Sequence, residues 1–98
     1  MQDPVLILGA TGSIGGAIAK RLATTGAVIL HGRNQKKLNL LKSDLSNSKH
    51  QIDSHLADLR RSDEVQSLFN KITIQHKKLS GIVFSVAQPF SNKLTHNI

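Results

Sequence analysis

Residues 9–15 read Gly-Ala-Thr-Gly-Ser-Ile-Gly, and they stand between the apolar residues 5–8 and the alanine-rich residues 17–23. This order is typical of a tight turn that joins a buried strand to a helix. Glycines allow a ligand to approach the backbone closely, while the start of the helix presents free N–H groups and the positive end of its dipole. We interpret the segment as a phosphate-binding turn; the alternative is a turn whose glycines serve only steric needs.

The spacing of the glycines separates two kinds of nucleotide site. A mononucleotide P-loop ends its G-x-x-x-x-G motif with Lys-Ser or Lys-Thr, whereas residues 17–19 here are Ala-Ile-Ala. Gly9, Gly12 and Gly15 follow G-x-x-G-x-x-G, which is close to the G-x-G-x-x-G of many dinucleotide sites. The spacing excludes a P-loop and favours a dinucleotide.

The chain alternates between strand patterns and helix patterns. We expect strands at residues 5–8, 27–31, 51–56 and 81–86, and helices at 14–25, at 35–45 and from about Ser62. Repeated strand-helix-strand units require parallel strands and right-handed crossovers. We therefore expect one α/β domain over residues 1–98, a three-layer Rossmann-like doubly wound sheet of strand order 3-2-1-4. Its ligand would lie at the carboxyl ends of the strands.

The helix patterns also predict which side chains are buried. In the first helix, Ile14, Ile18 and Leu22 recur at helical spacing, and Ala17, Ala19 and Ala23 are expected to permit a close approach. Gly26 is expected to end this helix as its C′ residue. The stripe expected for the third helix is Val65, Leu68, Phe69 and Ile72.

The order of these landmarks resembles the short-chain dehydrogenase/reductase family. The family's glycine motif, Thr-Gly-x-x-x-Gly-x-Gly, places Gly9 and Gly15 at its first and third glycines and Ser13 at its second. The G-x-x-G-x-x-G variant of its extended and atypical branches matches at all of Gly9, Gly12 and Gly15. The resemblance covers essentially the whole chain, which corresponds to the first part of a family member. It implies a sheet truncated after its fourth strand.

The residue after the second strand bears on the choice of cofactor. NAD-specific dinucleotide folds place Asp or Glu there, because a carboxylate pairs with the ribose hydroxyls and repels a 2′-phosphate. Here the strand leads into Gly32-Arg33-Asn34, and a guanidinium offers a 2′-phosphate a planar, charge-assisted fork. NADP-preferring family members resemble this chain at Arg33. We therefore expect NADP(H) to be favoured over NAD(H), with a solvated loop charge as the alternative interpretation.

Two later segments extend the resemblance. Asp58-Leu59 resembles the acidic pair after the family's third strand, where the carboxylate accepts from the adenine amino group and the next N–H meets the ring. Residues 84–87 replace the Asn-Asn-Ala-Gly with which the family ends its fourth strand. The cofactor contacts that the resemblance implies are Gly9, Thr11, Gly12, Ser13, Ile14, Gly15, Arg33, Asn34, Asp58, Leu59, Ser85 and Ala87.

The family's chemistry rests on a Ser-Tyr-Lys group in which the Tyr acts as acid and base while hydride passes to or from the nicotinamide. This sequence contains no tyrosine, so no catalytic residue is assigned. The resemblance implies the cofactor-binding N-terminal half of an NADP(H)-dependent oxidoreductase acting on a carbonyl or alcohol. The alternatives are a non-catalytic nucleotide-binding or regulatory protein, and a structural or nucleic-acid-associated fragment whose glycine turn binds nothing.

Composition adds further expectations. The formal net charge of +7 comes from dispersed basic residues, without tyrosine or tryptophan for base stacking, so we expect no nucleic-acid partner. The five histidines form no metal-ligand pattern and the chain has no cysteine, so no metal site is expected. Without a membrane span or a secretory signal, a cytoplasmic protein is the expectation. The apolar fourth strand would be an open edge, which predicts self-association.

Overall fold

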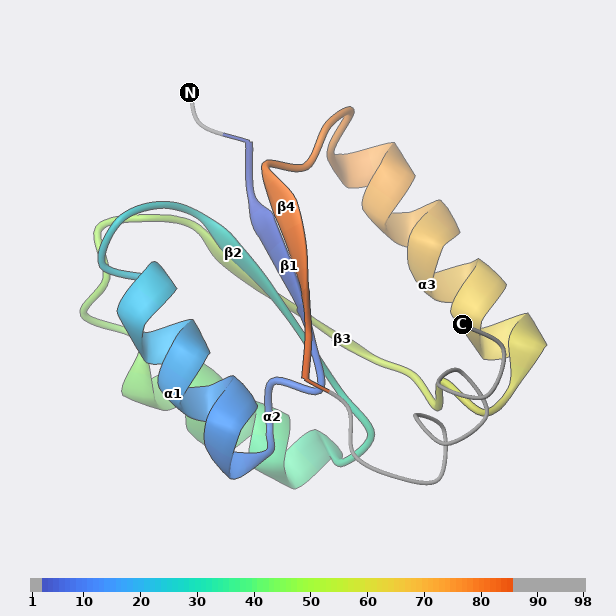
Figure 1. Ribbon diagram of the computed structural model, residues 1–98, viewed down its shortest axis with the longest axis horizontal. Helices are drawn as coiled ribbons and strands as arrows, with labels where there is room; N and C mark the ends of the chain where they lie inside the picture. The colour runs from blue at the N-terminus through green and yellow to red at the C-terminus, as the bar shows by residue number, and fades with distance from the viewer. Residues whose placement is uncertain (1–2, 86–98) are drawn as a thin grey trace.

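The computed structural model of the chain describes residues 3–85. Its strands are β1 (Val5–Leu8), β2 (Val28–Gly32), β3 (Ile52–Leu56) and β4 (Gly81–Phe84). They form one sheet in the order β3-β2-β1-β4, in which every neighbouring pair is parallel (Figure 1). The predicted strand order is confirmed.

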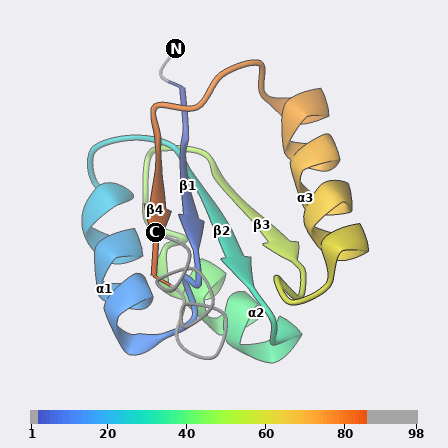
Figure 2. The same ribbon diagram turned by 45° about the vertical axis from the view of Figure 1, so that its right-hand side comes forward.

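Helices cover both faces of this sheet. α1 (Ser13–Leu22) and α2 (Gln35–Asp44) lie on one face, and α3 (Ser62–Gln75) lies on the other (Figure 2). Side chains alternate between the faces along β2, so Val28 and Leu30 pack toward α1 and α2 while Ile29 packs toward α3. Leu6 and Ile7 of β1 are fully buried, as expected for a central parallel strand that is covered on both sides.

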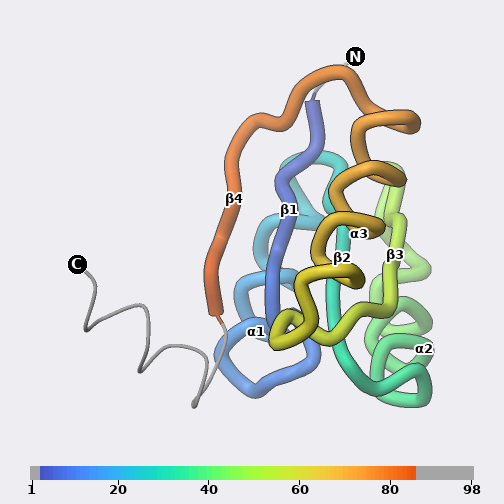
Figure 3. Tube along the Cα trace, turned by 90° about the vertical axis from the view of Figure 1, so that its right-hand side faces the viewer, coloured from blue at the N-terminus to red at the C-terminus, as the bar shows by residue number. Residues whose placement is uncertain are grey.

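The strands all run in one direction, so their carboxyl ends meet at one edge of the molecule. The amino ends of α1, α2 and α3 lie at this same edge (Figure 1). Figure 3 shows β4 at the outer side of β1, where Ile82 and Phe84 are 53% and 50% exposed. The apolar edge is therefore present, and self-association through it stays a prediction.

The end of the first helix differs from its prediction. α1 ends at Leu22 and not at Thr25. The hydroxyl of Thr24 donates to the Arg21 carbonyl and that of Thr25 to the Leu22 carbonyl, which gives these groups partners outside a regular helix. Gly26 donates its N–H to the Leu22 carbonyl without a positive φ. The prediction of Gly26 as the C′ residue was wrong, because Ala23 is the C-cap of α1.

The buried face of α1 agrees in part with its prediction. Ile14 is 70% exposed, and the face against the sheet is formed by Gly15, Ala19 and Ala23. These small side chains let the helix backbone approach the strands, which larger residues on that face would prevent. The close approach expected at Ala19 and Ala23 is confirmed and Leu22 packs against the core, whereas Ile14 and Ala17 are exposed.

The other boundaries agree more closely. Both ends of β2, β3 and α2 lie within one residue of their predicted positions, and α3 begins at Ser62 as expected. Leu68 and Ile72 of α3 are buried, with Val65 and Phe69 packed beside them, which confirms that stripe. Residue 86, the predicted end of the fourth strand, lies outside the described residues. None of the helices found within residues 3–85 is long and apolar enough to cross a membrane.

Candidate functional site

The turn after β1 depends on two of its three motif glycines. Gly9 has a φ of 82°, a left-handed conformation that side chains other than glycine rarely adopt. At Gly15 an added Cβ would lie 2.1 Å from the Gly9 carbonyl oxygen and 3.0 Å from the Ala10 Cα. An added Cβ at Gly12 would lie 3.7 Å from the same oxygen, which is an ordinary contact. Gly9 and Gly15 are thus required by the fold, whereas Gly12 is not.

The amino end of α1 is open to an anion. Gly12 is its N-cap and supplies no side-chain hydrogen bond, and the first turn holds no acidic residue. α2 differs, because the side chain of Asn34 caps it by accepting from the Lys37 N–H at 3.0 Å. The first N–H groups of an uncapped helix have no intrahelical partner. In α1 they lie directly beyond the glycine turn, where Ser13 and Ile14 are exposed.

Neighbouring strands hold other expected residues beside this turn. An added Cβ on Gly32 would lie 2.7 Å from the Thr11 Cγ2, so Thr11 is packed against the end of β2. The Ser85 N–H donates to the Leu8 carbonyl at 2.8 Å, which places Ser85 next to the residue that enters the turn. Ala87 lies outside the described residues.

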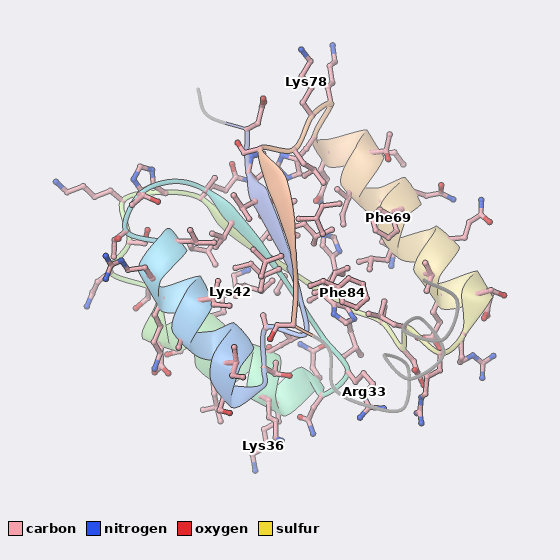
Figure 4. The ribbon with its side chains drawn as sticks, viewed as in Figure 1. Arg33, Lys36, Lys42, Phe69, Lys78 and Phe84 are labelled. Atoms are coloured by element: carbon pink, nitrogen blue, oxygen red, sulfur yellow. The ribbon has the colours of Figure 1, made fainter. Side chains whose placement is uncertain are left out.

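Arg33 stands between the end of β2 and the N-cap of α2, so its backbone is fixed on both sides. Its side chain is exposed at the carboxyl edge of the sheet (Figure 4). Its charge also acts on Asp58 and on His31, which places it on the same side as the acidic residue after β3. Asn34 follows Arg33, and its side-chain oxygen is occupied by the cap of α2.

Asp58 is held by the residue two positions later. Its Oδ1 accepts from the Arg60 backbone N–H and from Nε, both at 3.0 Å, and its Oδ2 accepts from Nη2 at 2.9 Å. These bonds, the side-chain bond first, lower the Asp58 pKa to about 2. A carboxylate keeps acceptor capacity beyond these bonds, so Asp58 can still accept from a further donor. Leu59 buries its side chain in the core beneath α3.

Replacing Arg60 with alanine is expected to raise the Asp58 pKa from about 2 toward the ordinary 3.8, because the guanidinium is lost. The rise should be incomplete, because the residue 60 backbone N–H remains. Ionised Asp58 contributes stability that is present above pH 3.8 and lost as the pH falls through about 2. Carboxyl NMR titration measures this pKa. Arg61→Ala is the matched control, because Arg61 pairs with Asp63 and Glu64 instead; an equal shift in both variants would contradict the assignment.

Sequence reasoning missed one residue of this region, His31. Its side chain is 2% exposed, and it accepts from the Gly9 N–H at 3.0 Å. The available signal was a polar residue inside a strand that is otherwise apolar. The histidines were judged only as metal ligands, and residues 3–85 contain no cluster of three or more His, Asp or Glu side chains suited to a metal.

The sequence of this chain is similar to those of known dehydrogenases and reductases. A model of the short chain dehydrogenase family matches residues 3–97. The chain belongs to the short-chain dehydrogenase/reductase family. Sulfoacetaldehyde reductase 2 of Chromohalobacter salexigens is 33% identical over 84 residues, which are 85% of this chain and 33% of that protein.

Solved structures of short-chain dehydrogenases/reductases share the fold. A metagenomic short-chain oxidoreductase in complex with NADP is 26% identical with a TM-score of 0.76, over 82% of this chain and 37% of that one. An NAD⁺-bound xylitol dehydrogenase is 25% identical with a TM-score of 0.76, over 82% of this chain and 31% of that one. The chain spans 25% to 40% of the length of the curated relatives that it matches. The family binds nicotinamide dinucleotides, and its known structures include both NADP and NAD⁺ complexes.

Proposed function

We propose that this chain binds NADP(H) at the carboxyl edge of its sheet and forms the cofactor-binding part of an oxidoreductase. The bound cofactor would exchange hydride with a small-molecule carbonyl or alcohol. The observation that carries the proposal is the uncapped, acid-free amino end of α1 beside the turn of Gly9 and Gly15. Such an end suits a pyrophosphate, because its N–H groups and dipole both favour an anion.

Residues around the turn complete the proposed site. Asp58 would accept from the adenine amino group, and the Leu59 N–H, which donates to no protein acceptor within residues 3–85, would meet the ring. Arg33 would pair with the 2′-phosphate of NADP(H). Ser85 would lie near the cofactor where β4 ends beside the turn. The acid-base group of the family has no counterpart here, because the sequence contains no tyrosine.

Ser13, the first residue of α1, offers a direct test of the proposed pyrophosphate site. We expect Ser13→Asp to weaken the binding of both NADPH and NADH by about 10-fold, because its carboxylate repels the pyrophosphate. The fold should persist, since an acid in the first turn of a helix is favourable. Titration followed by cofactor fluorescence or heat measures the effect.

Ser13→Asn is the matched control, because asparagine has the shape of aspartate without its charge. It should bind both dinucleotides more tightly than Ser13→Asp does. Equal affinities in the two variants would mean that the dinucleotide does not lie at α1. No binding of either cofactor to the folded wild-type chain would refute the proposed function itself.

The alternative function is a nucleotide-binding protein without catalysis. Both functions predict cofactor binding, so binding does not separate them. The mass of the native protein separates the two functions, because a non-catalytic protein that consists of this chain alone would have a mass of 10.7 kDa. A larger native protein that contains the Ser-Tyr-Lys group would favour the oxidoreductase.

A further inference from the structure

His31 connects the glycine turn to two strands of the sheet. It is the fourth residue of β2, and alternation along the strand directs its side chain toward the α3 face. The Gly9 N–H donates to Nδ1 at 3.0 Å, and Nε2 lies 2.8 Å from the Ala57 carbonyl oxygen after β3. The side chain is 2% exposed, so water does not replace either bond. One buried ring thus joins the ends of β1, β2 and β3.

These partners define the protonation state of the ring. A backbone N–H can only donate, so Nδ1 must accept and carries no proton. A carbonyl can only accept, so Nε2 carries the proton and donates to Ala57. A second proton on Nδ1 would place two donors 3.0 Å apart with no acceptor between them. The arrangement therefore requires a neutral histidine.

The same residue holds the turn at two successive positions. Besides the ring bond to Gly9, the His31 carbonyl accepts from the Ala10 N–H at 2.8 Å. Gly9 is the left-handed residue of the turn, and its carbonyl accepts from the Gly12 N–H. The same carbonyl oxygen lies where a Cβ on residue 15 would need room. The orientation of the Gly9 peptide thus sets the path of the backbone into α1.

We infer that His31 is a positioning residue of the dinucleotide site, whose neutral ring holds the Gly9 turn in its binding shape and whose protonation loosens it. The inference rests on the proposed function, because it concerns the affinity of that same site. Cofactor binding should consequently weaken at acid pH through a group that does not touch the cofactor.

The charged and titratable surroundings of His31 favour the neutral ring. Burial lowers its pKa from the ordinary 6.5, and Arg33 and His55 lower it further, while the bond to Ala57 and the charge of Asp58 oppose this shift. His55 faces it in register from β3. β1, the turn residues 9–12 and the buried part of α2 present no titratable side chain, and on α3 Glu64 accepts from the Asp58 N–H and pairs with Arg61.

The pKa direction fixes the sign of the effect. The folded chain binds this proton less readily than the unfolded chain, so the contribution of His31 is complete above pH 6.5. It is lost as the pH falls below that value through the lowered pKa of the folded state. The same range should show the loss of cofactor affinity.

The experiment compares the full chain with His31→Asn at about pH 8 and about pH 5.5. Asparagine places an oxygen near the position of Nδ1, so it can accept from the Gly9 N–H but does not titrate in this range. NADPH and NADH are the probes. The 2′-phosphate of NADPH itself titrates at about pH 6. This contribution cancels when the affinity of the wild type is divided by that of the variant. We expect the wild-type affinity to fall more between these pH values than that of His31→Asn, by less than about 10-fold because the folded-state pKa of His31 lies below 6.5.

Two controls make the result specific. His76→Gln removes a histidine that pairs with Asp53 at the opposite edge of the sheet, and it should keep the wild-type pH dependence. His31→Gln keeps an amide that can donate toward Ala57 but offers Gly9 a poorly placed acceptor, so it should bind more weakly than His31→Asn at about pH 8. Equal pH dependence in wild type and His31→Asn would overturn the inference.

An NMR titration of the wild-type chain needs neither cofactor nor variant. The ¹⁵N shifts of the His31 ring should show the Nε2–H tautomer, and the Gly9 amide shift should follow the His31 titration. A Gly9 amide that ignores this titration would overturn the inference even if His31→Asn failed to fold. If wild type binds no dinucleotide at about pH 8, the proposed function fails, and the NMR result still decides whether His31 controls the turn.

Discussion

Gly15→Ala is expected to abolish dinucleotide binding and to destabilise the chain by about 3 kcal/mol, the upper end for overpacking of a rigid interior. The added Cβ would lie 2.1 Å from the Gly9 carbonyl oxygen and 3.0 Å from the Ala10 Cα. Both neighbours are backbone atoms, so no side chain can rotate away to relieve the contact. Either α1 separates from the turn or Gly9 leaves its conformation, and each outcome removes the pyrophosphate site. For a domain of this size the melting temperature should fall on the order of 15 °C.

Gly16→Ala provides the matched control in the same helix. A Cβ at this position would lie 3.5 Å from the Ala10 carbonyl oxygen, which is an ordinary contact. Alanine is also the better helix former, so this variant should be as stable as wild type or more stable by about 0.5–1 kcal/mol. Thermal melts by circular dichroism, together with NADPH titration, compare the two variants. If Gly15→Ala melted like Gly16→Ala and still bound NADPH, the close approach of α1 to the turn would be wrong.

The fold was predictable because its signals are local and repeated. β1, β2 and β4 are short and mostly apolar, and each helix has its own spacing and start. The parallel order β3-β2-β1-β4 then followed from right-handed crossovers and the doubly wound arrangement. Element boundaries were accurate where a side chain marks them, as Asn34 does when it caps α2. They were poorest at the end of α1, where Thr24 and Thr25 redirect their hydroxyls to helix carbonyls.

The buried face of α1 was predictable in part. The small residues Ala19 and Ala23 were expected to allow a close approach, and they lie against the sheet with Gly15. Ile14 has the spacing of the apolar residues of this helix but is exposed. Hydrophobic spacing alone does not show which residues at the start of a helix face the sheet, because the preceding Gly9 turn sets the path of the backbone into α1.

The candidate site was predictable only in part, for a related reason. The glycine turn could be found because its residues are adjacent in sequence. The bonds of His31 join residues 22 and 26 positions away, so they exist only once three strands are paired. The bidentate contact of Arg60 with Asp58 is short in sequence but depends on the turn after β3. Roles that arise from tertiary geometry left no clear signal in the chain.

Arg33→Glu is expected to reverse the proposed cofactor preference. The guanidinium would otherwise form a charge-assisted fork with the 2′-phosphate, and its loss should weaken NADPH binding by about 100-fold, or about 3 kcal/mol. A carboxylate at this place would also pair with the ribose hydroxyls, as in NAD-specific folds, so NADH affinity should be unchanged or higher. The wild-type side chain is exposed, and therefore the melting temperature should hardly change.

Lys71→Glu separates this local effect from the change in net charge. Lys71 is exposed on α3, and its replacement alters the charge of the chain by the same amount as Arg33→Glu. Long-range attraction of an anionic cofactor is weakened alike in both variants and is screened by salt. A fork at the 2′-phosphate predicts that only Arg33→Glu exchanges NADPH for NADH as the tighter ligand, and that the exchange persists at higher salt. If both variants lost NADPH affinity equally, Arg33 would be a solvated charge and the cofactor preference would have to come from residues beyond this edge of the sheet.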